Sequence, residues 1–185
     1  MSKNIVLIRF SLREEGNCAA ITARINNYYA AERVSSFVVD NNTIHPCSNC
    51  NYECLRSEKI CPNLTDDLIK VMNAICEADL TYYVVPNYCG YPCANYFAFN
   101  ERSVGYFNMD RALMQKYMEA PKRFIVVSNT EGQNFEMAMQ QQTISKPEIL
   151  YLKTGKYGKQ SIAGDLMGSG AAKTDLDVFL DQYPF

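Results

Sequence analysis

Residues 4–18 read NIVLIRFSLREEGNC, and this stretch decides the fold. Its first half, Asn4 to Phe10, is a short β-branched and aliphatic run, which is typical of a strand buried on both faces of a sheet. A polar turn follows, and Cys18 to Ala31 then repeats apolar residues at helical spacing. A buried strand that leads through a polar loop directly into a helix is the first half of a βαβ unit.

The same alternation continues along the chain. It predicts further strands at Val34–Asp40, Leu80–Val85, Arg123–Val127 and Glu148–Leu152. It predicts helices from Asp66 to near Ala78, over 91–118 in two pieces broken near 105–108, over 133–145 and over 173–183. Strands that alternate with helices imply a mainly parallel sheet covered on both faces. Ligands bind such sheets beyond the carboxyl ends of the strands, so the loops at 10–18, 86–95 and 128–135 are the ones to inspect.

Composition narrows the class of protein. With 185 residues, 48% hydrophobic and 21% charged, the chain suits one globular domain over 1–185. Lys plus Arg is 18 against Asp plus Glu at 20, so no nucleic-acid partner is expected. The apolar runs are far shorter than the roughly 20 residues that cross a bilayer, and the start lacks signal-peptide features. We therefore expect a cytoplasmic protein with no membrane partner, whose eight cysteines are thiols or metal ligands rather than disulfides.

The loop at 10–18, between the first predicted strand and the first predicted helix, is suited to bind a monophosphate. It offers a hydroxyl, a guanidinium, a side-chain amide and the unpaired N–H groups of a helix start, which together favour an anion. An ordinary polar turn is the alternative interpretation. No GxGxxG or GxxxxGK[ST] motif is present, which disfavours dinucleotide or nucleoside triphosphate sites of those kinds. Cys18 and Arg24 have the Cys-x5-Arg spacing of cysteine phosphatases, but the residues between them lack the glycines that wrap a phosphate.

The second and third loops suit a flat heteroaromatic ring. Residues 86–92 read PNYCGYP and supply two aromatic side chains, an amide and backbone donors, while 128–132 read SNTEG and supply small polar groups. Either aromatic ring could instead simply cover the core, because tyrosine-rich turns are common in a chain with thirteen tyrosines.

Taken in order, these motifs resemble a known family. The chain looks like the flavodoxin-like NAD(P)H-dependent FMN reductases in three motifs. These are SxRxxGNC after the first strand, an insert that runs from HPCSNC at 45–50 to CPNLTDD at 61–67, and a strand that ends in PNY. The chain is most similar to their iron-sulfur flavoprotein branch. The resemblance covers roughly residues 4 to 135. It implies an α/β, flavodoxin-like, doubly wound five-stranded parallel sheet of order 2-1-3-4-5, with a Cys-rich insert at about 41–64 after the second strand.

The resemblance also implies a function. FMN would bind at the switch point of the sheet, with NAD(P)H as electron donor and a small molecule, a quinone or a cluster as acceptor. A homodimer or homotetramer is expected, with aromatic residues of the 91–107 segment as interface candidates, namely Tyr96, Phe97, Phe99 and Tyr106. The candidate cofactor-binding residues are Ser11, Arg13, Asn17, Cys18, Pro86, Asn87, Tyr88, Cys89, Gly90, Ser128, Asn129 and Thr130. We name no catalytic side chain, because the flavin carries the chemistry.

The insert holds four of the eight cysteines, Cys47, Cys50, Cys54 and Cys61. Their gaps of two, three and six residues differ from the two-residue second gap of the branch. Four thiolates suit a 4Fe-4S cluster or a structural zinc, and spare thiols without metal remain open. The runner-up function is a non-catalytic flavin electron carrier or a redox-sensing module with a zinc or thiol insert. A third alternative is a chain whose loops no longer bind flavin. Outside the insert, we expect Cys76 in the core and Cys89 and Cys93 packed.

Overall fold

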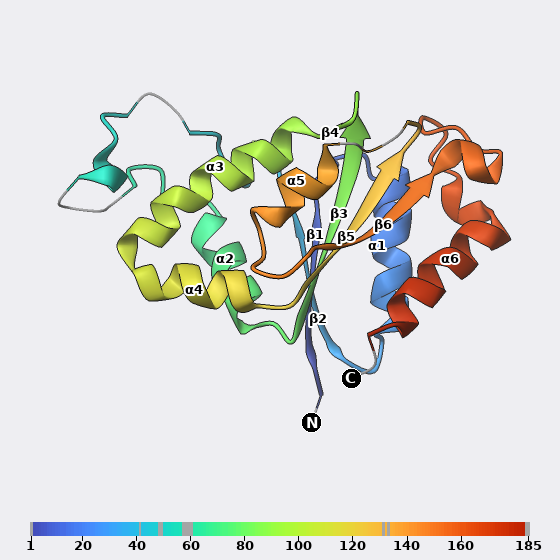
Figure 1. Ribbon diagram of the computed structural model, residues 1–185, viewed down its shortest axis with the longest axis horizontal. Coiled ribbons are helices and arrows are strands. Elements are labelled where there is room, and N and C mark those ends of the chain that lie inside the picture. The colour runs from blue at the N-terminus through green and yellow to red at the C-terminus, as the bar shows by residue number, and fades with distance from the viewer. Residues whose placement is uncertain are drawn as a thin grey trace.

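A computed structural model describes residues 2–40, 42–47, 50–56, 61–130, 132 and 134–183, except for the side chain of Met109. Five parallel strands form the centre: β1 (Asn4–Arg9), β2 (Arg33–Val38), β3 (Leu80–Tyr88), β5 (Lys122–Ser128) and β6 (Glu148–Lys153). They are ordered β2-β1-β3-β5-β6, and the two-residue β4 (Tyr91–Pro92) pairs antiparallel with the end of β3. Figure 1 shows all five carboxyl ends at the same edge of the sheet.

The predicted strand order needs one correction. We expected five strands in the order 2-1-3-4-5, whereas the sheet has six strands and the order is 2-1-3-5-6. The difference arises because β3 continues past Pro86 to Tyr88 and turns back on itself as a short hairpin with β4. The doubly wound α/β class is as expected.

Helices cover both faces of the sheet, as Figure 1 shows. α1 (Asn17–Tyr28) and α6 (Gly170–Asp181) pack on one face. α2 (Leu68–Glu77), α3 (Ala94–Met109), α4 (Arg111–Glu119) and α5 (Phe135–Gln140) pack on the other. Among the described residues, three 3₁₀ turns complete the elements: η1 (Glu53–Leu55), η2 (Thr154–Tyr157) and η3 (Leu166–Gly168).

Alternation along β1 explains the two cores. Ile5 and Leu7 belong to the cluster under α1 and α6, whereas Val6 and Ile8 belong to the cluster under α2 to α5. Successive side chains of a strand point to opposite faces, so a strand with apolar residues at every position must be covered on both. Cys76 lies in the second of these clusters, as expected, together with Cys93 and three of the four aromatic interface candidates, Tyr96, Phe99 and Tyr106. Only the fourth candidate, Phe97, is exposed.

Several helix boundaries differ from the prediction by a few residues, and two of them have a visible physical cause. The break between α3 and α4 falls at Asp110, whose carboxylate accepts from the Ala112 N–H at 2.8 Å, rather than near 105–108. Gly105 stays inside α3 because the helix packs there against the insert, where a Cβ would lie 3.1 Å from the Cβ of Cys61. α5 ends at Gln140 rather than 145, since the Gln140 amide donates to the carbonyl oxygens of Thr143 and Ser145.

None of the helices in the described parts of the chain has the length and apolar character that a bilayer crossing requires.

Arg102 on α3 holds both ends of the Cys-rich insert. Its guanidinium donates to the carbonyl oxygens of His45 (2.6 Å) and Asn63 (2.7 Å) and to the carboxylate of Asp66 (2.7 Å). The side chains of Arg102 and Asp66 are each only 1% exposed. Burial raises the pKa of Asp66, but hydrogen bonds from Arg102 and from the backbone N–H groups of Leu68 and His45 outweigh it and lower the pKa overall. The base of the insert is therefore fixed by a buried ion pair.

We predict that Arg102→Gln lowers the free energy of unfolding by about 3–5 kcal/mol, because it leaves a buried carboxylate without its cation. The double variant with Asp66→Asn should recover part of this loss. Since the pKa of Asp66 is lower in the folded state, its contribution is present above the unfolded value and is lost as pH falls through the folded value. Urea unfolding of wild type, Arg102→Gln, Asp66→Asn and the double variant from neutral to acidic pH measures both effects. A loss below about 1 kcal/mol would place this pair in the range of exposed ion pairs.

Candidate functional site

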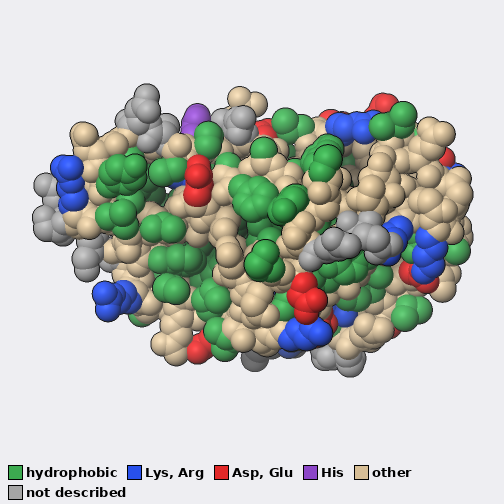
Figure 2. All heavy atoms as spheres, turned by 45° about the horizontal axis from the view of Figure 1, so that its top comes forward, with side chains coloured by type: hydrophobic (Ala, Val, Ile, Leu, Met, Phe, Trp, Pro, Cys, Tyr) green, Lys and Arg blue, Asp and Glu red, His purple; other side chains and the backbone are tan. Residues whose placement is uncertain are grey.

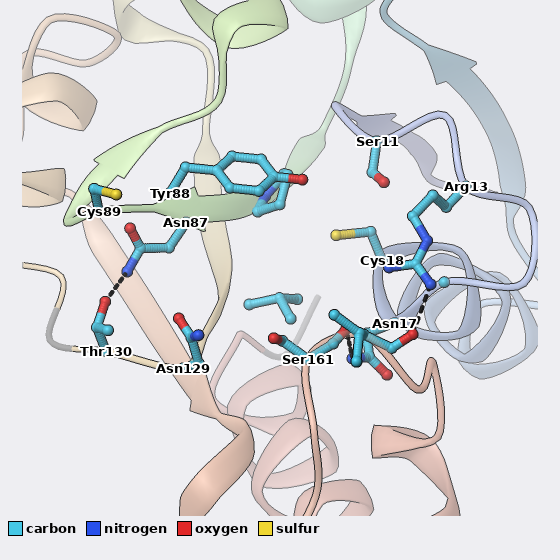
Figure 3. A pocket seen from close by; sticks show the side chains of 14 residues that line it. Ser11, Arg13, Asn17, Cys18, Asn87, Tyr88, Cys89, Asn129, Thr130 and Ser161 are labelled. Atoms are coloured by element: carbon cyan, nitrogen blue, oxygen red, sulfur yellow. Dashed lines mark hydrogen bonds between the residues drawn. The ribbon is translucent and has the colours of Figure 1, made fainter.

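The loops that follow β1, β3, β5 and β6 enclose a cavity of about 320 Å³ at the carboxyl edge of the sheet. Figure 3 shows this cavity with Tyr88 on one side and Ser161 on the other. Ten of the twelve predicted cofactor-binding residues line it, namely Ser11, Arg13, Asn17, Cys18, Pro86, Asn87, Tyr88, Cys89, Asn129 and Thr130. The prediction therefore located one cavity from three separate segments of sequence.

The N-terminus of α1 forms one end of the cavity. Gly16 is the N-cap residue and no side chain caps the helix, so the first N–H groups lack a capping partner. The loop between β1 and α1 is held in place by the buried side chain of Arg9, which donates to the Arg13 carbonyl (3.4 Å) and to the Glu14 carboxylate (3.1 Å). Unpaired N–H groups at a helix start, together with the helix dipole, favour a bound anion.

Arg13 adds a positive charge at the same end. One of its nitrogens donates to the carbonyl oxygen of Ile162 at 2.7 Å, and Figure 3 shows the side chain beside Ser11 and Asn17. A guanidinium carries five N–H donors, so this single bond leaves others for a ligand. The arrangement is suited to a phosphate group.

Asn17 also has a role in the fold that the sequence did not indicate. Its side-chain oxygen accepts from the Leu166 N–H (2.9 Å) and its nitrogen donates to the Ser161 carbonyl (3.2 Å). We expected this amide to hold a phosphate, but both of its polar atoms bind the loop after β6. Asn17 therefore positions that loop, and only its remaining N–H and its backbone are left for a ligand.

Cys18 lies in the wall of the cavity as a neutral thiol. Burial raises the pKa of Cys18 to about 12, and Cys93 adds to this effect, while Arg9 and Arg13 oppose it. The side chain is 4% exposed. A protonated thiol is a weak donor, so it contributes little to holding an anion.

Asn87 joins the second loop to the third. Its amide donates to the hydroxyl oxygens of Ser128 (2.5 Å) and Thr130 (3.2 Å) and accepts from the Gly90 N–H (2.9 Å). Ser128 and Gly90 are the two predicted residues that do not line the cavity. The reason is physical: the Ser128 hydroxyl and the Gly90 N–H are bonded within the loops, where they support the wall.

The hairpin between β3 and β4 projects aromatic side chains beside the cavity. Cys89 and Gly90 have φ values of 54° and 86°, the positive values that a two-residue type I′ turn requires. Tyr88 is 62% exposed and Tyr91 is 50% exposed, and Cys89 is exposed as well. Cys89 is therefore not packed in the core, which corrects the expectation. Figure 2 looks obliquely onto this end of the molecule and shows hydrophobic side chains gathered in the middle of the face.

Four lining residues were not predicted, namely Gly16, Val127, Ser161 and Ile162. Ser161 and Ile162 come from the loop after β6, where 154–170 holds five glycines. Two signals could have found them: the loop follows a parallel strand, and its glycines allow close backbone approach. Gly16 and Val127 adjoin predicted residues.

The described cysteines of the insert share one neighbourhood without forming a metal site. Burial raises the pKa of Cys47, and Glu101, Cys50, Cys54 and Cys61 raise it further by their charges. Yet no group of three or more His, Cys, Asp or Glu side chains among the described residues is arranged to hold a metal ion. The described arrangement therefore gives no support to a cluster or a zinc ion at the four thiols, and we derive no electron transfer through the insert.

Thiol reactivity should separate the two cysteines that line the cavity. The thiolate is the reactive form, so a buried thiol with a raised pKa reacts slowly and an exposed one reacts fast. We predict that iodoacetamide modifies Cys89 in the folded protein, whereas Cys18 is modified only on unfolding. Peptide mapping by mass spectrometry over time measures both sites, with Cys89→Ser as the control. Equal rates at Cys18 and Cys89 would contradict the described burial.

No protein-family model and no curated protein matches this sequence. Solved structures do match. The Trp repressor binding protein of Bacillus subtilis has a TM-score of 0.65 at 14% identity, covering 98% of this chain and 99% of that one. An FMN-dependent NADH-azoreductase of Bacillus anthracis, solved with FMN, has a TM-score of 0.64 at 9% identity, covering 96% and 98%. The apo NADH:FMN oxidoreductase EmoB has a TM-score of 0.56 at 10% identity, covering 99% and 91%. At such identities, the likeness shows that this chain shares their fold.

Proposed function

We propose that this protein is an FMN-dependent oxidoreductase that takes electrons from NAD(P)H and passes them to a small-molecule acceptor. The proposal rests on one observation: a single cavity has an anion-binding end and an end suited to a planar ring. An uncapped helix start beside Arg13 forms one end, and the loops that carry Tyr88 and Thr130 form the other. A ligand with a charged tail and a planar ring suits both ends at once.

The phosphate end would bind the cofactor tail. The donors would be the backbone N–H groups of residues 17 and 18, the hydroxyl of Ser11 and the guanidinium of Arg13. Charge-assisted hydrogen bonds of this kind are stronger than neutral ones. Cys18 stands where the family has Thr, and its wall position suits contact through the backbone rather than the thiol.

The ring end would orient the isoalloxazine. Pro86 and Val127 offer apolar surface there, and Asn129 and Thr130 offer polar groups to a ring edge. FMN, when bound, accepts a hydride and passes on its electrons. The chain's own residues bind the ring, hold it at the sheet edge and shield part of it from water.

The exposed aromatic side chains beside the cavity indicate the chemical class of the electron acceptor. Exposed Tyr88 and Tyr91 leave aromatic surface beside the cavity, where a planar acceptor could stack. The names of the structural neighbours include an NADH:FMN oxidoreductase and an NADH-azoreductase, which describe those proteins. Here they support a nicotinamide donor and a soluble aromatic acceptor as the proposal.

The resemblance also implied a homo-oligomer, which we retain as part of the proposal. A second copy of the chain would cover some of the exposed hydrophobic residues, among them Leu12, Tyr88, Tyr91 and Phe97.

Reduction by a pyridine nucleotide separates the enzyme from a flavin electron carrier. We predict that the purified protein, loaded with FMN in the absence of oxygen, loses its visible flavin absorbance when NADH or NADPH is added. An added quinone should then restore the absorbance. A carrier would keep its colour with both nucleotides and lose it only with a protein donor or dithionite. Protein that retains no FMN after gel filtration would contradict the proposal itself.

Removal of the Arg13 guanidinium tests the phosphate end. We predict that Arg13→Ala weakens FMN binding about tenfold to a hundredfold, the loss expected for a charge-assisted hydrogen bond worth about 1.5–3 kcal/mol. Riboflavin, which lacks the phosphate, should lose much less. Titration of flavin fluorescence gives both dissociation constants, and Arg13→Lys serves as the matched control for charge. Equal losses of affinity for FMN and riboflavin would contradict the assignment of the phosphate to this end of the cavity.

A further inference from the structure

Two cysteines of the insert, Cys54 and Cys61, lie against the same glycine of helix α3. A Cβ built on Gly105 would lie 3.1 Å from the Cβ and 3.5 Å from the sulfur of Cys61, and 3.9 Å from the Cβ of Cys54. The Cβ atoms of the two cysteines therefore lie at most about 7 Å apart, against the roughly 3.5–4.5 Å that a disulfide requires. Because Gly105 has no side chain, the space between the two cysteines is left for their sulfurs.

The electrostatic interactions of Cys54 point to the same pairing. Burial raises the pKa of Cys54, and the charge of Cys61 raises it further, ahead of the charge of Cys50. Cys54 belongs to η1, the short teal helix in Figure 1, which lies beside α3. The thiol with the strongest effect on Cys54 is thus the one that shares Gly105 with it.

Cys61 is the fixed member of the pair. It is only 6% exposed, and Arg102 donates to the carbonyl oxygen of Asn63, two residues further along the chain. Burial lowers the pKa of Arg102, but Asp66 and then Cys61 raise it, and the overall pKa is raised. Among the described residues, the buried Nε of Arg102 has no hydrogen-bond partner. Cys61 therefore lies close to a guanidinium that is itself held in place.

We propose that Cys54 and Cys61 form a reversible thiol–disulfide site, which is oxidised by a low-molecular-weight disulfide such as glutathione disulfide. Both are free thiols in the structure. Disulfides that form among otherwise reduced thiols are usually transient, and redox-sensing or catalytic. The site uses none of the residues of the cavity, so it goes beyond the proposed flavin chemistry and does not rest on it.

Exposure sets the order of the chemical steps. The half-buried Cys54 sulfur attacks the small disulfide, whose S–S bond breaks, and the first small thiol leaves with the proton of Cys54. The Cys61 sulfur then attacks the Cys54 sulfur, and the second small thiol leaves with the proton of Cys61. The two protein thiols lose two electrons in all, and the small disulfide gains them. The new bond ties η1 to the base of the insert that Arg102 holds.

Peptide mapping tests the pairing. The reduced full-length protein is incubated with a defined mixture of reduced and oxidised glutathione, and the remaining thiols are blocked with N-ethylmaleimide. Digestion after Lys, Arg and Glu releases Cys54 in residues 54–56 and Cys61 in residues 60–70, with the other two cysteines of the insert on a separate peptide. We expect mass spectrometry to find the first two peptides joined. The absence of this pair, or Cys61 joined to the separate peptide, would overturn the proposal.

Single serine variants test the order of the steps. Cys61→Ser should accumulate one glutathione on Cys54, because the second thiol is absent. Cys54→Ser should leave Cys61 unmodified in the folded protein, since Cys61 is buried. Cys47→Ser and Cys50→Ser are the matched controls and should form the bridge as wild type does. Glutathione on Cys61 in Cys54→Ser, at the rate seen for Cys54 in Cys61→Ser, would contradict this order.

Gly105→Ala tests the position of the pair. The added methyl group would lie 3.1 Å from the Cβ of Cys61, so it should strain the bridge and lower the equilibrium constant for its formation with glutathione about tenfold. Gly155→Ala, whose Cβ would have nothing within 4 Å, is the control. An unchanged equilibrium constant in folded Gly105→Ala, as judged by circular dichroism, would contradict the placement of both thiols against Gly105.

If Gly105→Ala does not fold, the peptide maps of wild type and of the serine variants decide the matter. None of these measurements requires bound FMN, so a failure of the disulfide site and a failure of the flavin site are separate results.

Discussion

The structure depends on the burial of its central strands on both faces. Ile5, Val6, Leu7 and Ile8 are all 0% exposed, and every residue of β5 is buried. A strand with no polar face must be covered twice, which requires helical crossovers and therefore parallel neighbours. Parallel strands all end at one edge, so the loops after them meet there. The cavity exists because of this constraint rather than because of any one motif.

The sequence allowed the prediction of the features that obey this constraint. The apolar runs at Asn4–Phe10 and Leu80–Val85 indicated buried strands, and the topological rule then placed their loops together. The side chains that supply polar groups to the cavity, such as Ser11 and Arg13, could be named from the residue types of the loop after the first strand and from the family motif that it resembles. These predictions succeed because they need only local pattern and one rule of connection.

What the sequence did not reveal depends on partners far away in the chain. The side-chain oxygen of Asn17 accepts a hydrogen bond from the Leu166 N–H, 149 residues later in the chain. No sequence pattern near Asn17 indicates that partner. The same holds for Arg102, which reaches back 57 residues to His45. The break at Asp110 was missed for a related reason: Gly105 lies inside α3, where the helix packs closely against Cys61. Tertiary contacts override local helix propensity at such points.

Helix α3 connects the cavity and the insert, and its geometry keeps them apart. Asn95 at its start donates to the Phe10 carbonyl, next to the first loop, while Gly105 near its other end contacts Cys61. Ten residues of α-helix span about 15 Å, at 1.5 Å per residue. The thiols of the insert therefore lie well away from the cavity along this helix, and their base is anchored by Arg102 and Asp66. Substitutions at that anchor should act on the stability of the insert, whereas a substitution at Arg13, which lines the cavity, should act on the ligand.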